Sequence, residues 1–357
     1  IDNDGYQDVY CSNLGPDQLF LNNGDGTFSD MSSTLPAGDL PIGSSYISPL
    51  LDFDGDKNVD LLLTQEFGMV VQRNQIYQNL GPSTDGTWIS WANRSETAGL
   101  RHPEAAMGAA IFDLNSDTLP EIFLTNLLEN AGSTETLYFQ SQPFIFEDQS
   151  GTYGVNGLVS SEESGLYRTS SWAALNFDYN NDSYDDLYTV YGHHQDGDEM
   201  WRQCPTFIAV CENQPNALYQ NANNQAFTQL SGTGSEDHGM GRGAAAADIN
   251  GDGCLDIVSV NVNEPSRLLL NRCTYPNHSA KFELEGTASN RDAVGTVLIA
   301  KTADNVHQTK YITAGSTSVH SSQPFGVHIG TGTADTIETL TVHWPSGTTE
   351  TLENIPT

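Results

Sequence analysis

Positively charged residues are scarce in this 357-residue chain, which has 13 lysines and arginines against 46 aspartates and glutamates. The formal net charge at pH 7 is −33. A nucleic-acid-binding protein needs a basic surface that neutralises phosphates, and this composition excludes that class of protein. Acidic residues in such excess either cover a solvated surface or bind metal ions, and we expect both explanations to hold here.

Long apolar runs are also missing from the chain. No segment approaches the ~18 apolar residues of a membrane-spanning helix, so we expect no membrane span. The nucleophile elbow of serine hydrolases, the P-loop and the dinucleotide-binding glycine pattern are absent as well. No signal peptide is visible, but the chain begins within a motif, and that absence therefore carries no information.

The clearest motif lies in Gly239–Asn263, where an acidic loop separates two strand-like runs. Alternating oxygen side chains on a tight turn point inward, as calcium requires from its six to eight oxygen ligands. The backbone carbonyl of Cys254 can supply a further oxygen. An EF-hand would need flanking helices and a glutamate at the twelfth position, where this loop has Ser259. The sequence therefore predicts a calcium loop inside a β-hairpin, with the residues Asp248, Asn250, Asp252, Gly253 and Asp256.

The same loop recurs along the chain, with the starts of the last four copies 61 to 70 residues apart. A unit of this size with about four short strands is typical of one blade of a β-propeller. We therefore predict an all-β fold with a calcium-binding β-propeller. The candidate calcium ligands are Asp2, Asp4, Tyr6 and Asp8; Asp52, Asp54, Asp56, Asn58 and Asp60; Asp113, Asn115, Asp117, Leu119 and Glu121; Asp178, Asn180, Asp182, Tyr184 and Asp186; and Asp248, Asn250, Asp252, Cys254 and Asp256.

These five loops resemble the FG-GAP or VCBS repeats of integrin-α-type β-propellers. The resemblance implies that each loop joins the first two strands of a blade and that the chain holds about four to five Ca²⁺ ions. It also implies that the five visible blades are part of a larger ring, expected to have seven. Lys57, Thr118 and Ser183 replace the turn glycine, and Glu121 replaces the closing aspartate. The third loop is therefore expected to be the weakest calcium site.

The repeat stops near Tyr275, and the remaining chain differs in kind. Its succession of short strands and turns, which ends on Trp344-Pro345-Ser346-Gly347, resembles the ASPIC/UnbV domain that follows such propellers in proteins like cartilage acidic protein. The resemblance implies a small β domain packed on the propeller and assigns it no biochemical activity. We therefore predict two domains, a propeller over residues 1–276 and a small β domain over residues 277–357.

Five cysteines indicate an oxidising compartment. Cys204 and Cys211 bracket a short insertion and are predicted to form a disulfide. Cys254 and Cys273 lie in the same blade and form a plausible second pair. Cys11 is then left over, either to pair outside these residues or to remain a buried thiol.

Sequons for N-glycosylation fit an extracellular, secreted protein. We expect modification at Asn93 and Asn277, whereas the sequon at Asn181 lies inside a calcium loop. If the source is an ordinary bacterium, none of these sites need be modified.

The function expected from this pattern is that of a secreted structural or adhesive protein that binds other extracellular proteins or glycans. The alternative is an extracellular carbohydrate-active enzyme of the sugar dehydratase or lyase type on the same propeller. Its candidate residues are the histidines and carboxylates of His193–Glu199, together with His238, although a solvated polar loop is the commoner explanation for such a cluster. Fold alone does not decide between these classes.

The ends of the ring carry one more expectation. The first blade lacks its first strand and the fifth has no clear fourth strand, so these residues alone should not close a ring. Either the sequence is a fragment whose upstream blades are missing, or neighbouring chains complete the open edge and build an oligomer or polymer. A closed monomeric ring would refute both explanations.

Overall fold

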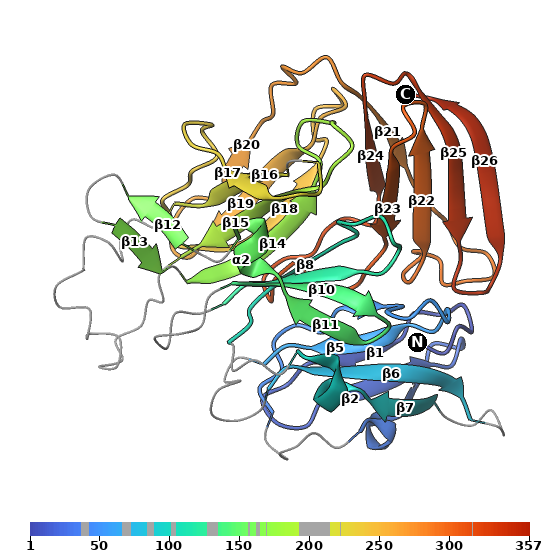
Figure 1. Cartoon of the computed structure of the whole chain (residues 1–357). Coiled ribbons are helices and arrows are strands. Elements are labelled where there is room, and N and C mark those ends of the chain that lie inside the picture. The colour runs from blue at the N-terminus through green and yellow to red at the C-terminus, as the bar shows by residue number, and fades with distance from the viewer. Residues whose placement is uncertain are drawn as a thin grey trace, which may run out of the picture.

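The computed structural model describes residues 1–36, 43–65, 73–83, 89–100, 105–126, 135–155, 158–161, 165–168, 170–192, 215–221, 223–315 and 317–357. In these residues the protein is built from antiparallel strands, with helices of at most four residues (Figure 1). The predicted all-β class is confirmed. None of the described helices is long and apolar enough to cross a membrane.

Five antiparallel sheets follow one another along the chain as blades of a propeller. The second, third and fourth sheets have four strands each, and the first and fifth have three. The blades consist of β1 (Val9–Cys11), β2 (Gln18–Asn22) and β3 (Phe28–Asp30); β4 (Leu50–Leu51), β5 (Asp60–Leu63), β6 (Gln75–Pro82) and β7 (Ile89–Asn93); β8 (Ala109–Phe112), β9 (Glu121–Leu124), β10 (Thr136–Gln142) and β11 (Ile145–Asp148); β14 (Ser171–Phe177), β15 (Asp186–Tyr191), β16 (Ala217–Asn221) and β17 (Phe227–Gln229); and β18 (Gly241–Ala247), β19 (Asp256–Asn261) and β20 (Arg267–Leu269).

The hydrophobic core lies between neighbouring blades. Leu62 and Ile76 of the second blade pack with Ile122 and Tyr138 of the third, and all four side chains are buried. Similar clusters join the third blade to the fourth and the fourth to the fifth. Because both faces of each inner sheet are covered, strands such as Asp60–Leu63 are buried at every position rather than at alternate ones.

Short elements connect or flank the blades. The 3-10 helix η1 (Ser32–Thr34) and the α-helices α1 (Ser95–Ala98) and α2 (Ser150–Tyr153) follow the last strands of the first three blades. The hairpin of β12 (Leu158–Ser161) and β13 (Gly165–Arg168) precedes the fourth blade.

The C-terminal strands form two sheets of their own, drawn in red at the right of Figure 1. Their buried apolar residues make a separate core that includes Leu298, Ile329 and Leu340. The boundary between residues 276 and 277 stays a prediction. One sheet pairs β21 (His278–Phe282) with β24 (Val327–Gly332), and the other has the order β23 (His307–Tyr311), β22 (Val297–Thr302), β25 (Thr336–His343) and β26 (Thr349–Pro356).

A segment between β23 and β24 runs along the first strands of several blades. The N–H of Leu50 in β4 donates to the carbonyl of Ala314 at 3.0 Å, and the N–H of Ala174 in β14 donates to that of Thr317 at 3.2 Å. The N–H of Ala246 in β18 donates to the side-chain oxygen of Gln323 at 2.9 Å. Since the first strands of neighbouring blades lie side by side, this segment of the C-terminal part occupies the middle of the propeller.

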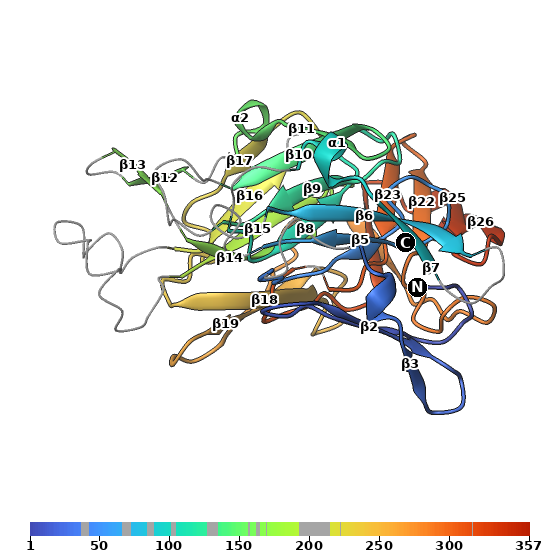
Figure 2. The same cartoon turned by 90° about the horizontal axis from the view of Figure 1, so that it is seen from below.

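The described residues do not close a ring. In Figure 1 the first blade lies at the bottom and the fifth at the top, with the other blades between them. No strand pairing among the described residues joins these two sheets. In the view from below, β2 and β3 of the first blade are separate from β18 and β19 of the fifth (Figure 2). The fragment and the assembly explanations both remain predictions.

Candidate metal centres

The four complete acidic loops connect the first strand of a blade to the second, and the loop at the N-terminus leads into β1. All five turn through left-handed backbone at the same two positions. The sixth position has φ values of 95° at Gly5, 77° at Lys57, 69° at Thr118, 82° at Ser183 and 86° at Gly253. The three residues that replace glycine therefore adopt the same conformation as glycine, despite its cost for a β-branched threonine.

The first aspartate of each complete loop holds this conformation. Its two carboxylate oxygens accept the backbone N–H groups of the fifth and sixth loop residues. In the fifth loop, for example, Asp248 accepts the N–H of Asp252 at 3.1 Å and the N–H of Gly253 at 3.0 Å. The same pairs occur from Asp52 to Asp56 and Lys57, from Asp113 to Asp117 and Thr118, and from Asp178 to Asp182 and Ser183.

The closing carboxylate lies underneath the loop, with little or no exposure in the complete copies. One oxygen accepts the N–H of the second loop residue, as when Asp60 accepts from Phe53 at 2.8 Å. The other accepts the N–H at the end of the third strand, as from Asn79 at 2.8 Å. Glu121 departs from this rule, because its Oε1 is buried without a hydrogen-bond partner. A bound cation at the third loop would satisfy that oxygen.

The second loop holds the most compact group of carboxylates among the described residues, formed by Asp52, Asp54 and Asp60. Each offers one carboxylate oxygen, and the three oxygens lie within 4.8 Å of one another. Burial, together with repulsion from the neighbouring carboxylates, raises the pKa of Asp52 to about 6 and that of Asp60 to about 9. Three crowded and largely buried carboxylates are the electrostatic situation that a divalent cation relieves.

The third and fourth loops carry the same signature. Burial raises the pKa of Glu121 to about 9 and that of Asp178 to about 8, with added repulsion from Asp113 and Asp182 respectively. Burial also raises the pKa of Asp186 well above its ordinary value. Among the described residues, the two groups of side chains that could hold a metal ion are Asp52, Asp54 and Asp60 of the second loop, and Asp252 with the disulfide-bonded Cys254 and Cys273 at the fifth. Neither group contains a histidine, and carboxylate oxygen is the donor that calcium prefers.

The C-terminal strands cover the acidic loops. In the fourth loop, Lys310 pairs with Asp185, and a ring nitrogen of His328 lies 2.8 Å from the side-chain oxygen of Asn181. A Cβ atom at Gly330 would lie 2.1 Å from the carboxylate of Asp178, so no larger residue fits there. Further contacts reach the first loop through Asp292 and Gln7, the third through His307 and Ser116, and the fifth through Ser279 and Gly253.

The amide side chains that end the third strands were not identified from the sequence. The Nδ2 of Asn79 donates to the carbonyl of Val59 in its own loop and to that of Ile1 in the preceding loop. Gln140 reaches Phe53 of the preceding loop in the same way, at 2.6 Å. These residues tie the second loop to the first and the third to the second, and Asn271 ties the fifth to the fourth through the carbonyl of Tyr179. Aligning the repeats would have revealed the recurring position, which is occupied by Asn22, Asn79, Gln140, Asn221 and Asn271.

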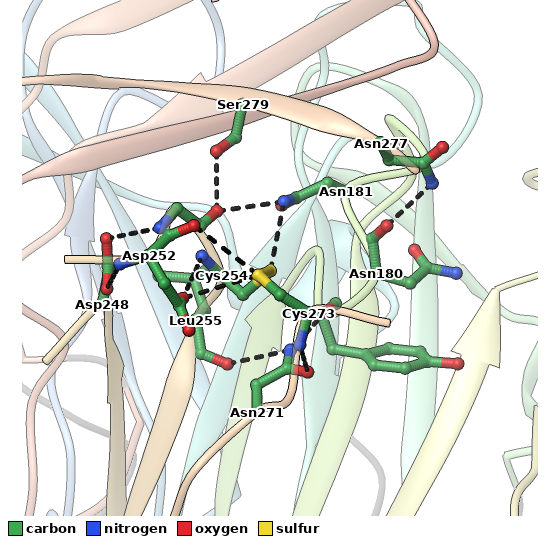
Figure 3. The surroundings of a disulfide bond; sticks show 12 residues. Asn180, Asn181, Asp248, Asp252, Cys254, Leu255, Asn271, Cys273, Asn277 and Ser279 are labelled. Carbon is green, nitrogen blue, oxygen red and sulfur yellow. Dashed lines mark hydrogen bonds between the residues drawn. A yellow bond between two sulfur atoms is a disulfide. The ribbon is translucent and has the colours of Figure 1, made fainter. Parts of the chain in front are cut away.

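A disulfide joins Cys254 to Cys273, the pair that the sequence suggests (Figure 3). It ties the seventh residue of the fifth loop to the chain that follows β20. Next to it, the side chain of Asn181 donates to the carbonyl of Gly253 at 3.0 Å, so the fourth and fifth loops meet at this point. Cys11 is free and half-buried. The predicted pair Cys204–Cys211 lies outside the described residues.

The remaining candidate residues are placed as follows. Asn93 is exposed, whereas the Nδ2 atom of Asn277 donates to the carbonyl of Asn180 at 2.8 Å, next to the fourth loop. His238 is exposed. The cluster His193–Glu199 lies outside the described residues.

We expect Lys310→Met to destabilise the protein by about 3 kcal/mol, because it leaves Asp185 as an uncompensated charge in a largely buried place. The two side chains are each 11% exposed. Chemical denaturation measures the loss. The control is Lys281→Met, whose partner Glu283 and own side chain are mostly exposed, and which should cost less than about 1 kcal/mol. Equal effects of the two substitutions would show that the Lys310 pair does not hold the C-terminal strands on the loops.

Two family descriptions match the sequence. Residues 1–63 and 178–259 match the FG-GAP-like repeat, and residues 286–357 match ASPIC and UnbV. The chain therefore combines FG-GAP-like repeats with a C-terminal ASPIC and UnbV domain. The matched repeats contain the first, second, fourth and fifth acidic loops, and the matched domain contains the C-terminal strands except β21, which precedes it.

Curated relatives match a short part of this FG-GAP-like chain. Cartilage acidic protein 1 of Xenopus tropicalis is 49% identical over 61 residues, which cover 16% of this chain and 9% of that protein. The Mus musculus protein is 46% identical over 61 residues, with the same coverage. The Homo sapiens protein is 42% identical over 66 residues, covering 18% of this chain and 10% of that one. The match thus spans about a tenth of the length of these relatives.

Among solved structures, the rhamnogalacturonan lyases YesW and YesX are similar at 12% sequence identity and a TM-score of 0.33 each. The alignments cover 99% of this chain and 67% of YesW, and 94% of this chain and 72% of YesX. A likeness at this level does not bear on activity.

Proposed function

We propose that the chain is an extracellular calcium-binding protein with a structural or adhesive role. The observation that carries the proposal is the shared conformation of the five acidic loops, which bend at the same positions whether the residue there is glycine, lysine, threonine or serine. Lysine, threonine and serine adopt this left-handed backbone at a cost in free energy. We take the retained strain as support for a function of the turn, which is to direct the oxygen atoms of the loop toward a bound cation.

The residues fit Ca²⁺ in each loop. Carboxylate or amide side chains stand at the third and fifth positions, and a first and a closing carboxylate complete the set in the four full loops. When bound, calcium would supply the positive charge that these crowded carboxylates lack.

The proposed role of the ions is to stabilise the folded arrangement of the blades and the C-terminal domain. The loops make three kinds of contact besides their own turns: with their own blades, with a neighbouring loop through third-strand amides such as those of Asn79 and Gln140, and, for the first, third, fourth and fifth loops, with the C-terminal part. Calcium at the loops would therefore stabilise both the contacts between blades and the contacts between the loops and the ASPIC and UnbV domain. Such a rigid architecture suits a protein that presents binding surfaces to other extracellular proteins or glycans, as a subunit of a larger extracellular assembly.

Extracellular chemistry tests the localisation. We expect peptide mapping without reduction to find Cys254 joined to Cys273 and Cys204 joined to Cys211. In a eukaryotic secretion host, we expect a glycan at Asn93 and none at Asn277, because the Asn277 amide is engaged beside the fourth loop. Asn93→Gln should then abolish the mass shift on deglycosylation, and Asn277→Gln should leave it unchanged. Free thiols at both Cys204 and Cys211 in native material would contradict the extracellular proposal.

A further inference from the structure

β20 (Arg267–Leu269) is the edge strand of the fifth blade, and it differs from the corresponding strands of the other blades in one respect. In the first four blades, the strand equivalent to β20 is followed in space by an outer strand, namely β3, β7, β11 or β17. Leu268 occupies the position of Leu19, Ile76, Leu137 and Leu218. Those four residues are at most 6% exposed, whereas Leu268 is 53% exposed.

The four outer strands obey one register rule. In every case an aromatic residue stands opposite the amide residue that ends the preceding strand, and a carboxylate or amide residue follows two positions later. The aromatic residues are Phe28, Trp91, Phe146 and Phe227, and the residues two positions later are Asp30, Asn93, Asp148 and Gln229.

Backbone and serine contacts complete the rule. The residue after the carboxylate or amide donates its N–H to the carbonyl of Leu19, Ile76, Leu137 or Leu218 in the respective blade. In the first three blades, a serine one residue further on accepts the N–H of that same apolar residue at 2.8 to 3.1 Å. The chain at the end of the outer strand therefore satisfies both backbone groups of the residue that corresponds to Leu268 in the first three blades, and its carbonyl in the fourth.

Beside β20 lies an open groove of about 730 Å³, lined by Phe177, Tyr179, Leu230 and Leu268 among others. In the third blade, the outer aromatic Phe146 packs against Phe53 of the preceding blade, with ring centroids 6.3 Å apart. In the fourth blade, Phe227 packs against Phe112 at 6.1 Å. Phe177 and Tyr179 of the fourth blade correspond to Phe112 and Phe53, so the groove lies where an outer aromatic residue would pack. Tyr275, which follows β20, lines the same groove and contacts Tyr179 with ring centroids 5.9 Å apart, so an added aromatic residue would pack on Phe177 beside this pair.

We propose that β20 is an acceptor edge for an extended peptide strand of the form aromatic-x-Asp/Asn-x-Ser, supplied from outside residues 1–357. The strand adds antiparallel to β20, places its aromatic side chain against Phe177 and Tyr179, and covers Leu268. Main-chain hydrogen bonds to the exposed edge supply affinity, and the groove supplies specificity for the aromatic residue.

Two observations favour this occupant. Each outer strand of this pattern among the described residues is already paired inside its own blade, so a second copy could donate one only by dismantling that blade. Charge is also complementary, because the exposed Arg272 follows the leucines of the edge in an otherwise acidic protein. Arg267 precedes these leucines and is also exposed, although its Nε lies 3.5 Å from a carboxylate oxygen of Asp237. None of the four outer strands contains a lysine or an arginine, and that of the third blade is acidic, with the run Phe146-Glu147-Asp148.

The probe is a fluorescein-labelled peptide with the sequence of the third blade's outer strand, PFIFEDQSGT from Pro143 to Thr152. Fluorescence anisotropy with the chain of residues 1–357 in calcium-containing buffer should give saturable binding. Leu268→Asp should weaken binding at least tenfold, since it places a charge beside the acidic strand and in the groove. Hydrogen exchange at the Leu268 amide should slow when the peptide is present.

Two controls make the result specific. Leu352→Asp places the same substitution on the exposed strand β26, where Leu352 is 49% exposed, and should leave peptide binding unchanged. A peptide with Phe146→Ala and Ser150→Ala should bind at least tenfold more weakly. Absence of saturable binding would overturn the proposal, and so would equal binding by the Leu268→Asp variant with its melting curve retained. A peptide-free dimer that Leu268→Asp dissolves would show that a second copy is the occupant, and would overturn it too.

Discussion

Chelation of divalent cations is expected to lower the melting temperature of the protein by more than about 10 °C. Each loop gathers carboxylates that repel one another without a cation, and the closing carboxylates lie buried beneath the loops. A ligand that binds only the folded state stabilises it by about 2.7 kcal/mol per site at a hundredfold excess over its dissociation constant. Each occupied site contributes in this way, but neighbouring loops touch one another, as the fourth and fifth do at Asn181 and Gly253, so the contributions are not strictly additive.

Circular dichroism in calcium buffer and in excess EDTA measures the difference, and return of calcium should restore the original curve. Metal analysis of the EDTA sample shows that the ions have been removed. The C-terminal strands should loosen at the same time, because they rest on the loops through contacts such as Lys310 with Asp185. If the melting temperature stays the same in a sample proven free of calcium, the ions do not lock the architecture.

The second large effect concerns pH. In the chelated protein, lowering the pH from about 8.5 to about 6.5 is expected to raise stability. Burial raises the pKa of Asp60 and Glu121 to about 9 and that of Asp178 to about 8. In the unfolded chain these groups return to ordinary acidic pKa values. Between the two values the folded state binds more protons than the unfolded state, so the free energy of unfolding falls as pH rises.

Calcium should remove this dependence, since a bound cation keeps the carboxylates ionised in the folded state. His328 does not interfere, because burial lowers its pKa to about 4, below the range tested. Urea unfolding at the two pH values, with and without calcium, gives the four free energies needed. A chelated protein that is less stable at pH 6.5 than at pH 8.5 would contradict the proposed role of these buried acids.

The sequence predicts the parts of this molecule that depend on near neighbours. Alternating acids, a turn residue and a closing acid specify the loop, and apolar runs on both sides specify the strands that it joins. The first aspartate explains why Thr118 can stand where glycine is expected, because its hydrogen bonds hold the left-handed turn. The Cys254–Cys273 pair is likewise close in sequence and in the same blade.

Contacts between residues far apart in the sequence could not be predicted, because no local pattern indicates them. The segment from Ala314 to Gln323 has no periodic pattern that would assign it to the middle of the propeller. Lys310 and Asp185 are 125 residues apart, and nothing local marks them as partners. The strand β26 was missed because most of its residues are exposed, so it lacks the alternation of buried and exposed positions on which strand prediction rests.

The most direct test of calcium binding is the metal content of the purified chain after dialysis against micromolar calcium, measured by inductively coupled plasma mass spectrometry. We predict about four to five calcium ions per chain, and one fewer for Asp252→Ala, which removes a ligand of the fifth loop only. A chain that retains less than one calcium ion, or an Asp252→Ala variant with unchanged content, would contradict the assignment of the acidic loops as calcium sites.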